Sequence, residues 1–385
     1  MVGSLAVACS GGDERQGVGG GGDEVEGRGD DGQGEGGGEA CWRVAADEKL
    51  DYVLERSAIL EPGGELVILD ILGDRFQRLS RQGKVVAETD WDGVEGGWED
   101  ADPLRFERRG EVVVMELAGS RFVGLAETAE GEVLWAVDLW NPEIEGLGDA
   151  SLLVREWTWT GRDLLVLGSV RWGEDGEEER VMVVRAGRGR GEVEVLLELP
   201  GEREVAEFSR MGQTTYATTV AGRAAVLLMR EEPQIFVETG PGGELKPLEA
   251  MPAGLEARPV IEHLDWNHPV DFPVVHEEVE ASTMPVGLFG WRGKLFVLHR
   301  APEGETTSWW LSRIDPGADV VEARARLPTD ANHLTVAVGE ERWAFLEKGP
   351  IRGYGVQSVE SVLFIPGEMV EGAEMGGAMC SAPPP

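Results

Sequence analysis

Apolar runs of four to eight residues alternate with glycine turns along most of the chain after Trp42. The runs are rich in Val, Leu, Phe and Trp, and few helix signals interrupt them. Short apolar runs bounded by turn residues are typical of β-strands. The pattern therefore predicts an all-β fold.

The strongest apolar runs repeat as hairpins, each made of a strand, a glycine turn and a more apolar strand. Six such hairpins lie at 58–70, 104–116, 155–168, 216–229, 287–299 and 334–347. A second hairpin follows each of the first five, at 75–88, 121–137, 180–199, 234–248 and 309–327. Four strands that recur every 46 to 71 residues predict a six-bladed β-propeller of four-stranded antiparallel blades with loop insertions.

The sixth unit lacks a fourth strand of its own. After 360–372 the chain has no further convincing strand, whereas strand-like residues at 42–46 precede the first unit. An open ring would expose unpaired backbone groups at its edge. We therefore expect residues 42–46 to complete the sixth blade. Cys41 and Cys380 fall beside the two ends of this closure, so we expect a disulfide between them, with two free thiols as the alternative.

The stretch "LVILDILGDRFQRLSRQGKVV" at 66–86 resembles the NHL-type repeat of six-bladed propellers. In that repeat a strand ending in Asp precedes a polar residue, Arg, an apolar residue and a Gly-Lys turn. The matching residues are Asp70, Asp74, Arg75, Phe76, Gly83 and Lys84, and the second unit keeps Arg121, Phe122 and Gly131. The resemblance implies an NHL-like or TolB-like propeller over 41–380.

This resemblance implies no particular activity, because such propellers include binding scaffolds, sensors, lactonases and oxidoreductases. The polar residues of the repeat, Asp70, Asp74, Arg75 and Arg121, are interpreted as structural, with the arginines bracing neighbouring blades.

The N-terminus "MVGSLAVACSGG" resembles the lipobox of bacterial lipoproteins, with Cys9 as the lipidated residue. It departs from that pattern because Ala6 stands where Leu is commonest. In addition, the eight residues before Cys9 contain no Lys or Arg, whereas a secretory signal has a basic segment and a longer apolar one. Either the start codon is assigned too late or the match is due to chance.

The resulting domain prediction has four parts. Residues 1–8 are the remnant of a signal peptide, and the Gly-, Asp- and Glu-rich residues 9–40 form a disordered tether. Residues 41–380 form the propeller, and 381–385 form a Pro-rich tail. The expected location is the bacterial cell envelope, as an outer-membrane lipoprotein facing the periplasm or the cell surface.

Charge narrows the choice of partners. The 385 residues contain 35 Lys and Arg against 72 Asp and Glu, a formal net charge of −37. This excess argues against nucleic acid, whose phosphates need a basic surface. It suits basic partners or divalent cations, although a merely solvated acidic surface is the more common reason for such an excess. No apolar stretch is long enough for a membrane span, so contact with the membrane is expected only through a lipid at Cys9.

Two groups of polar residues could hold a metal ion. Three histidines and two aspartates between the fourth and fifth units could bind a transition metal, namely His263, His268, His276, Asp265 and Asp271. Four aspartates between the first and second units could bind Ca²⁺, namely Asp90, Asp92, Asp100 and Asp102. Neither spacing matches a known ligand motif, and ordinary polar loops are the alternative. No cofactor is firmly implied, and Ca²⁺ or another divalent cation is the candidate.

Motifs for nucleophilic catalysis, phosphate loops and zinc peptidases are missing from the sequence. The sequence therefore favours a monomeric, non-catalytic binding or scaffold module that holds a protein or a small molecule at one face of the ring. The alternative is a metal-dependent, lactonase-like hydrolase with its site at the central channel. A third option is a sugar-binding module, although the paired Trp157 and Trp159 and the pair Trp309 and Trp310 lie in strands and are expected to be buried.

Overall fold

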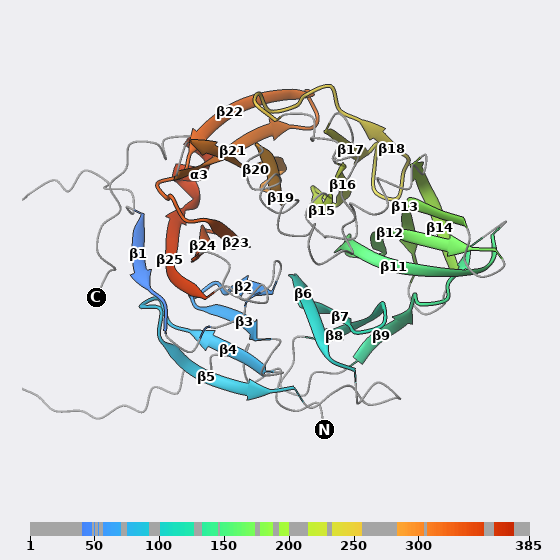
Figure 1. Ribbon diagram of the computed structural model, residues 1–385, viewed down its shortest axis with the longest axis horizontal. Coiled ribbons are helices and arrows are strands. Elements are labelled where there is room, and N and C mark those ends of the chain that lie inside the picture. The colour runs from blue at the N-terminus through green and yellow to red at the C-terminus, as the bar shows by residue number, and fades with distance from the viewer. Residues whose placement is uncertain are drawn as a thin grey trace, which may run out of the picture.

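The computed structural model arranges six β-sheets around a common axis, as the blades of a propeller (Figure 1). In blades 1, 2, 4 and 5 the first strand lies nearest the axis and the last lies at the rim (Figure 1). The structure describes residues 41–47, 50, 53, 57–70, 75–91, 101–126, 133–144, 147–173, 178–187, 192–199, 215–228, 233–255, 283–303, 306–349 and 358–372. The predicted signal remnant, tether and C-terminal tail lie outside these residues.

Blades 1 and 2 each have four antiparallel strands that follow the chain from the axis to the rim. The strands of blade 1 are β2 (Ala58–Leu60), β3 (Leu66–Asp70), β4 (Arg75–Leu79) and β5 (Val85–Asp90). Those of blade 2 are β6 (Pro103–Arg109), β7 (Val112–Leu117), β8 (Arg121–Ala126) and β9 (Val133–Asp138).

Blade 3 has a fifth, short strand that the sequence pattern did not predict. Its strands are β10 (Glu143–Ile144), β11 (Gly148–Trp159), β12 (Leu164–Trp172), β13 (Glu178–Ala186) and β14 (Glu192–Leu199). β10 pairs antiparallel with β11 and parallel with β14, which closes the sheet on itself. Because β11 is long and its register breaks between Val154 and Glu156, the sheet can curl enough for this contact.

Blades 4 and 5 return to four antiparallel strands. Blade 4 contains β15 (Thr215–Val220), β16 (Arg223–Leu228), β17 (Gln234–Glu238) and β18 (Leu245–Pro247). Blade 5 contains β19 (Met284–Trp291), β20 (Lys294–Glu303), β21 (Thr306–Asp315) and β22 (Val320–Arg326).

Blade 6 is completed by the beginning of the chain. It contains β23 (His333–Val338), β24 (Arg342–Lys348), β25 (Val359–Pro366) and, at the rim, β1 (Trp42–Ala45). β1 pairs antiparallel with β25, with Trp42 opposite Phe364 and Ala45 opposite Ser361. A short helix, α3 (Gly367–Gly372), follows β25. The predicted six-bladed fold and its closure by the N-terminal strand are both confirmed.

The core lies between the blades. The described residues contain a hydrophobic cluster at each of the six junctions, including the junction between blades 6 and 1. In β7, for example, Val113 and Met115 pack toward blade 1 while Val114 packs toward blade 3. A middle strand buried on both faces has to be apolar throughout, which explains continuous runs such as "VVVM". Rim strand β5 has one face in solvent and is mostly exposed.

The tryptophans are likewise divided between the buried inter-blade clusters and the surface. Trp157, Trp159 and Trp309 are buried in the inter-blade clusters, as the strand pattern predicts, and Trp310 is half-buried. Trp140, which follows β9, is 49% exposed. Among the described residues, no helix is long and apolar enough to cross a membrane.

Candidate functional site

The innermost strands of neighbouring blades run in the same direction. Tyr216 of β15 donates its hydroxyl hydrogen to the Pro285 carbonyl (3.3 Å), and the Gly290 N–H of β19 donates to Thr218 Oγ1 (3.0 Å). The later residue of β15, Thr218, contacts the later residue of β19, Gly290. The two strands therefore lie side by side and run parallel. The ring therefore has two different faces.

We call these the crossover face and the turn face. On the crossover face, the last strand of each blade leads into the first strand of the next. On the turn face, the first two strands of a blade meet in tight turns such as Ala221–Gly222, where both residues have positive φ. Positive φ at both central residues is the geometry of a two-residue hairpin.

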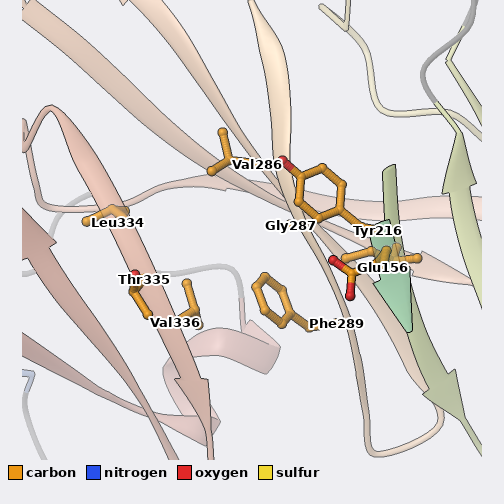
Figure 2. A pocket seen from close by; sticks show the side chains of 9 residues that line it. Glu156, Tyr216, Val286, Gly287, Phe289, Leu334, Thr335 and Val336 are labelled. Atoms are coloured by element: carbon orange, nitrogen blue, oxygen red, sulfur yellow. The ribbon is translucent and has the colours of Figure 1, made fainter. Parts of the chain in front are cut away.

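A small cavity is lined by the innermost strands of blades 3, 4, 5 and 6 (Figure 2). Its wall consists of Glu156 from β11, Tyr216 from β15, residues 286–289 from β19 and residues 334–336 from β23. The enclosed part of the cavity is about 20 Å³, enough for one water molecule at roughly 10–15 Å³, and the cavity is partly open to solvent.

Most of the cavity wall is apolar, and Glu156 supplies its carboxylate. Glu156 is buried, and its Oε1 accepts a hydrogen bond from the Trp157 N–H (2.9 Å). The same oxygen lies 3.5 Å from Nη1 of Arg105 on β6. The inner strands of blades 2 and 3 thus fix the carboxylate in position.

Arg105 is bound more closely to a second buried carboxylate. Its Nε donates to Glu116 Oε2 at 2.6 Å, and the Trp157 indole N–H donates to the same oxygen at 2.7 Å. Two buried carboxylates, Glu116 and Glu156, therefore share the Arg105 guanidinium. We call these four residues the Arg105 network. Buried charges are tolerated when they are paired and hydrogen-bonded in this way.

The predicted calcium ligands are only partly described. Asp90 ends β5 and Asp102 precedes β6, and both are exposed on the crossover face. The Asp102 carbonyl accepts a hydrogen bond from the Ala118 N–H (2.9 Å). Asp92 and Asp100 lie outside the described residues, so this site stays a prediction.

The predicted histidine site lies entirely outside the described residues, since His263, His268, His276, Asp265 and Asp271 all fall between Leu255 and Thr283. Within the described ranges, no group of three or more His, Cys, Asp and Glu residues is arranged to hold a metal ion.

The arginines of the repeat form ion pairs within their own blades. Arg75 Nη2 lies 3.0 Å from Asp70 Oδ2, directly across from it between β4 and β3. Arg121 Nε lies 3.3 Å from Asp138 Oδ2, between β8 and β9. Asp74 lies outside the described residues. Bracing of neighbouring blades by these arginines stays a prediction.

Cys41 is fully buried next to β1 and is disulfide-bonded. Cys9 and Cys380 lie outside the described residues, so the lipidation of Cys9 and the pairing of Cys41 with Cys380 stay predictions.

The sequence analysis did not identify the cavity residues. The available signal was a charge inside an apolar strand: Glu116 ends the run "VVVME", and Glu156 precedes Trp157 in "REWTW". A buried charge needs a partner. Arg105 lies directly opposite Glu116 in the β6–β7 hairpin, whereas Glu156 lies in the next blade, so its contact with Arg105 could not be assigned from the sequence.

Several solved structures resemble this chain in the overall course of the backbone, and their sequence identity to it is very low. No protein-family model and no curated protein matches the sequence. A member of the DUF4221 family from Bacteroides vulgatus is 9% identical, with a TM-score of 0.49, over 85% of this chain and 95% of that one. A Bacteroides fragilis protein described as exported is 11% identical, with a TM-score of 0.43, over 84% and 94%. The calcium-binding protein regucalcin from Agrobacterium tumefaciens is 10% identical, with a TM-score of 0.41, over 84% and 94%.

Proposed function

We propose that this propeller is a non-catalytic binding module that holds a protein or a small ligand at the crossover face of the ring. The cavity at the inner strands carries the proposal. Its wall is apolar apart from Glu156, Tyr216 and Thr335, which suits the binding of one small group. A metal-dependent hydrolase needs several carboxylates or imidazoles around its ion, and among the described residues this wall supplies one carboxylate, that of Glu156.

The crossover face is the side suited to recognition. The cavity extends along the inner strands, because Tyr216 and Leu334 are each the second residue of their strand, whereas Glu156 and Phe289 lie nearer the ends of theirs. The longest connections also leave from this face, including those from Pro247 to Met284 and from Leu199 to Thr215. Long connections on a rigid scaffold commonly carry binding residues, whereas the described connections between the first two strands of a blade, at the turn face, include tight turns such as Ala221–Gly222.

The N-terminal sequence supports a place in the bacterial envelope. The lipobox-like residues before Cys9 and the Gly-rich, acidic stretch up to residue 40 suit a lipid anchor and a flexible tether. Replacing Cys9 with Ser should abolish incorporation of an alkyne-labelled fatty acid into the chain. Equal labelling of wild type and Cys9→Ser would exclude this anchor.

Site-specific photo-crosslinking of the full chain in its native host tests the binding face. A photoreactive amino acid would replace Trp140 or Asp102, which are exposed on the crossover face, or Glu111 or Glu340, which are exposed on the turn face. Mass spectrometry would then identify protein and small-molecule adducts. We expect specific adducts from the crossover positions. Adducts from the turn positions alone, or from none of the four, would refute the proposal.

A further inference from the structure

A buried histidine lies between blades 4 and 5, outside the cavity described above. His299 of β20 is fully buried, and it points to the same side of its strand as Leu295 and Val297, which belong to the cluster between these blades. Its Nε2 lies 3.2 Å from Nη2 of Arg324 on β22. Because a guanidinium only donates hydrogen bonds, we assign Nε2 as the acceptor and place the proton of the neutral ring on Nδ1.

The Arg324 guanidinium connects this histidine to a neighbouring part of the chain. Its Cζ lies 4.2 Å from the centre of the Trp310 ring on β21, so it stacks on that ring while it contacts His299. A Cβ atom added to Gly254 would lie 3.6 Å from both Nη1 and Nη2 of Arg324. The backbone at Gly254 therefore lies directly against the guanidinium.

Gly254 belongs to residues 248–255, which we call the docked segment. This segment begins the connection between β18 and β19. The N–H groups of Glu249 and Ala250 donate to the Asp319 carboxylate of blade 5, at 3.0 and 2.9 Å. Ala250 also belongs to the cluster between blades 4 and 5, and three further side chains of the segment pack against that cluster, namely Leu248, Met251 and Leu255. The docked segment is thus held on blade 5 by Asp319, by apolar packing and by Arg324.

The charged groups around His299 favour its neutral form. The residues directly opposite it on β19 and β21 are uncharged, namely Pro285 and Trp310. Besides Arg324, the charged residues that the structure describes on this side of blades 4 and 5 are Arg223, Lys246, Glu249, Asp319, Arg326 and Glu303, the partner of Arg326. Arg324 contacts the ring directly, and a second positive charge 3.2 Å away on a buried ring is strongly unfavourable.

The effect of pH on the docked segment follows from this environment. Burial, together with the Arg324 guanidinium, lowers the pKa of His299 to about 4, whereas an exposed histidine has a pKa of about 6.5. A state in which Arg324 and the docked segment have moved away exposes the ring, so that state binds a proton more readily. Opening therefore becomes easier as pH falls from about 6.5 towards about 4.

We propose that His299 and Arg324 form a pH-sensitive latch, which holds the docked segment on blade 5 at neutral pH and releases it in mild acid. Protonation of His299 Nε2 removes the acceptor for Arg324 and places two positive charges side by side. The guanidinium then leaves its position on Trp310 and no longer supports the backbone at Gly254. The latch controls the beginning of a long inter-blade connection and does not depend on the binding function proposed above.

Hydrogen exchange of the full chain at pH 7 and pH 5, corrected for the intrinsic exchange rate, tests the latch. The reporters are the Glu249 and Ala250 amides, which are bound to Asp319. Their protection should fall about tenfold or more between pH 7 and pH 5. At pH 5 they should also exchange about tenfold faster than the amides of β24, which open only when the ring unfolds. Unchanged protection of the two amides, or exchange at the rate of β24, would overturn the proposal.

Replacing the histidine separates its titration from that of the carboxylates. His299→Gln keeps an acceptor for Arg324 but cannot be protonated in this range, so the protection of the two amides should differ by less than about twofold between pH 7 and pH 5. His333→Gln, which replaces a half-buried histidine of blade 6, is the matched control and should respond as the wild type does. A loss of protection in His299→Gln equal to that of the wild type would contradict the latch and assign the effect to another group such as Asp319.

A second variant keeps the test decisive if His299→Gln does not fold. Arg324→Ala removes the guanidinium from rim strand β22, where this residue is exposed. The docked segment should then be about tenfold less protected already at pH 7, and acid should change its protection little. Arg326→Ala, two residues further along the same strand, should keep the wild-type response. Wild-type protection of Arg324→Ala at pH 7, followed by the wild-type loss at pH 5, would overturn the proposal.

Discussion

Gly290 shows how closely the blades approach one another at a single residue. A Cβ atom at this position would lie 1.7 Å from the Thr219 carbonyl oxygen of the neighbouring blade. The Gly290 N–H donates to Thr218 Oγ1 in the same contact. Since the Thr219 carbonyl oxygen belongs to strand backbone, it cannot move aside without distorting a sheet.

Replacing Gly290 with Ala should therefore destabilise the protein by about 3 kcal/mol or more, through overpacking at the junction of blades 4 and 5. Gly240→Ala is the matched control, because its added Cβ would meet nothing within 4 Å, and its effect should stay below about 1 kcal/mol. Urea denaturation measures both variants. A Gly290→Ala midpoint equal to that of the wild type would show that the blades are less tightly packed than described.

His299 makes stability depend on pH. Its ring is fully buried on β20, and burial, together with the Arg324 guanidinium 3.2 Å from Nε2, lowers the pKa of His299 to about 4. The unfolded value is about 6.5. Between these values the unfolded chain binds a proton that the folded chain does not, so the free energy of unfolding falls as pH falls.

The loss from His299 should amount to about 3 kcal/mol between pH 7 and pH 4. His299→Gln removes the titrating ring, so its free energy of unfolding should fall less steeply over this range. Chemical denaturation at a series of pH values compares the two proteins. Parallel pH profiles for wild type and variant would contradict the assigned state of His299.

Predictability from sequence differs between kinds of residue. The turn at Gly83 and Lys84 could be predicted from the sequence because it depends only on adjacent residues. Gly290, inside the run "GLFGW", carried a weaker signal, since glycine within a strand indicates a close approach without naming the neighbour. The contact between Arg105 and Glu156 could not be predicted, because these residues meet only once blades 2 and 3 are packed, although Arg105 and Glu116 lie opposite each other within one hairpin.

At the scale of the elements, the closing strand β1 has the largest structural consequence. Its side chains alternate, with Trp42 and Val44 buried and Arg43 and Ala45 exposed. Arg43 Nη2 lies 2.8 Å from Glu347 of β24 and donates to the Pro328 carbonyl (2.7 Å). β1 therefore covers the open edge of β25 and joins blade 6 to both of its neighbours through packing and hydrogen bonds.

A charge on the buried face of β1 should open the ring. Val44→Asp places a carboxylate in the cluster between blades 6 and 1 and should cost about 3–4 kcal/mol. Ala45→Asp, one residue further on the exposed face, should change stability by less than about 1 kcal/mol. Thermal unfolding distinguishes the two variants. Equal effects would mean that β1 is not packed in the register described.

Sequence reasoning worked well for strands whose burial follows from local pattern. The hairpins and the closing strand could be predicted from the sequence because apolar runs and glycine turns are local signals. β10 was not, since two residues carry no periodicity and its pairing with β14 depends on the curl of blade 3. The cavity also depends on four blades together and so could not be derived from any one of them.

At the scale of the whole molecule, hydrophobic packing holds neighbouring blades together, and the chain carries a large negative charge. The clusters at the six junctions make each blade depend on both neighbours. The net charge of −37 attracts cations to the surface.

The central claim is that the ring binds a ligand without metal-dependent chemistry. The most direct test is thermal unfolding of the full chain after chelation, with Ca²⁺, Mg²⁺, Mn²⁺ and Zn²⁺ added back one at a time. Specific binding at 100 times the dissociation constant would add about 2.7 kcal/mol to the free energy of unfolding. We predict no saturable rise in the melting temperature that is particular to one cation. A saturable rise with one cation alone would contradict the account and favour the metal-dependent hydrolase.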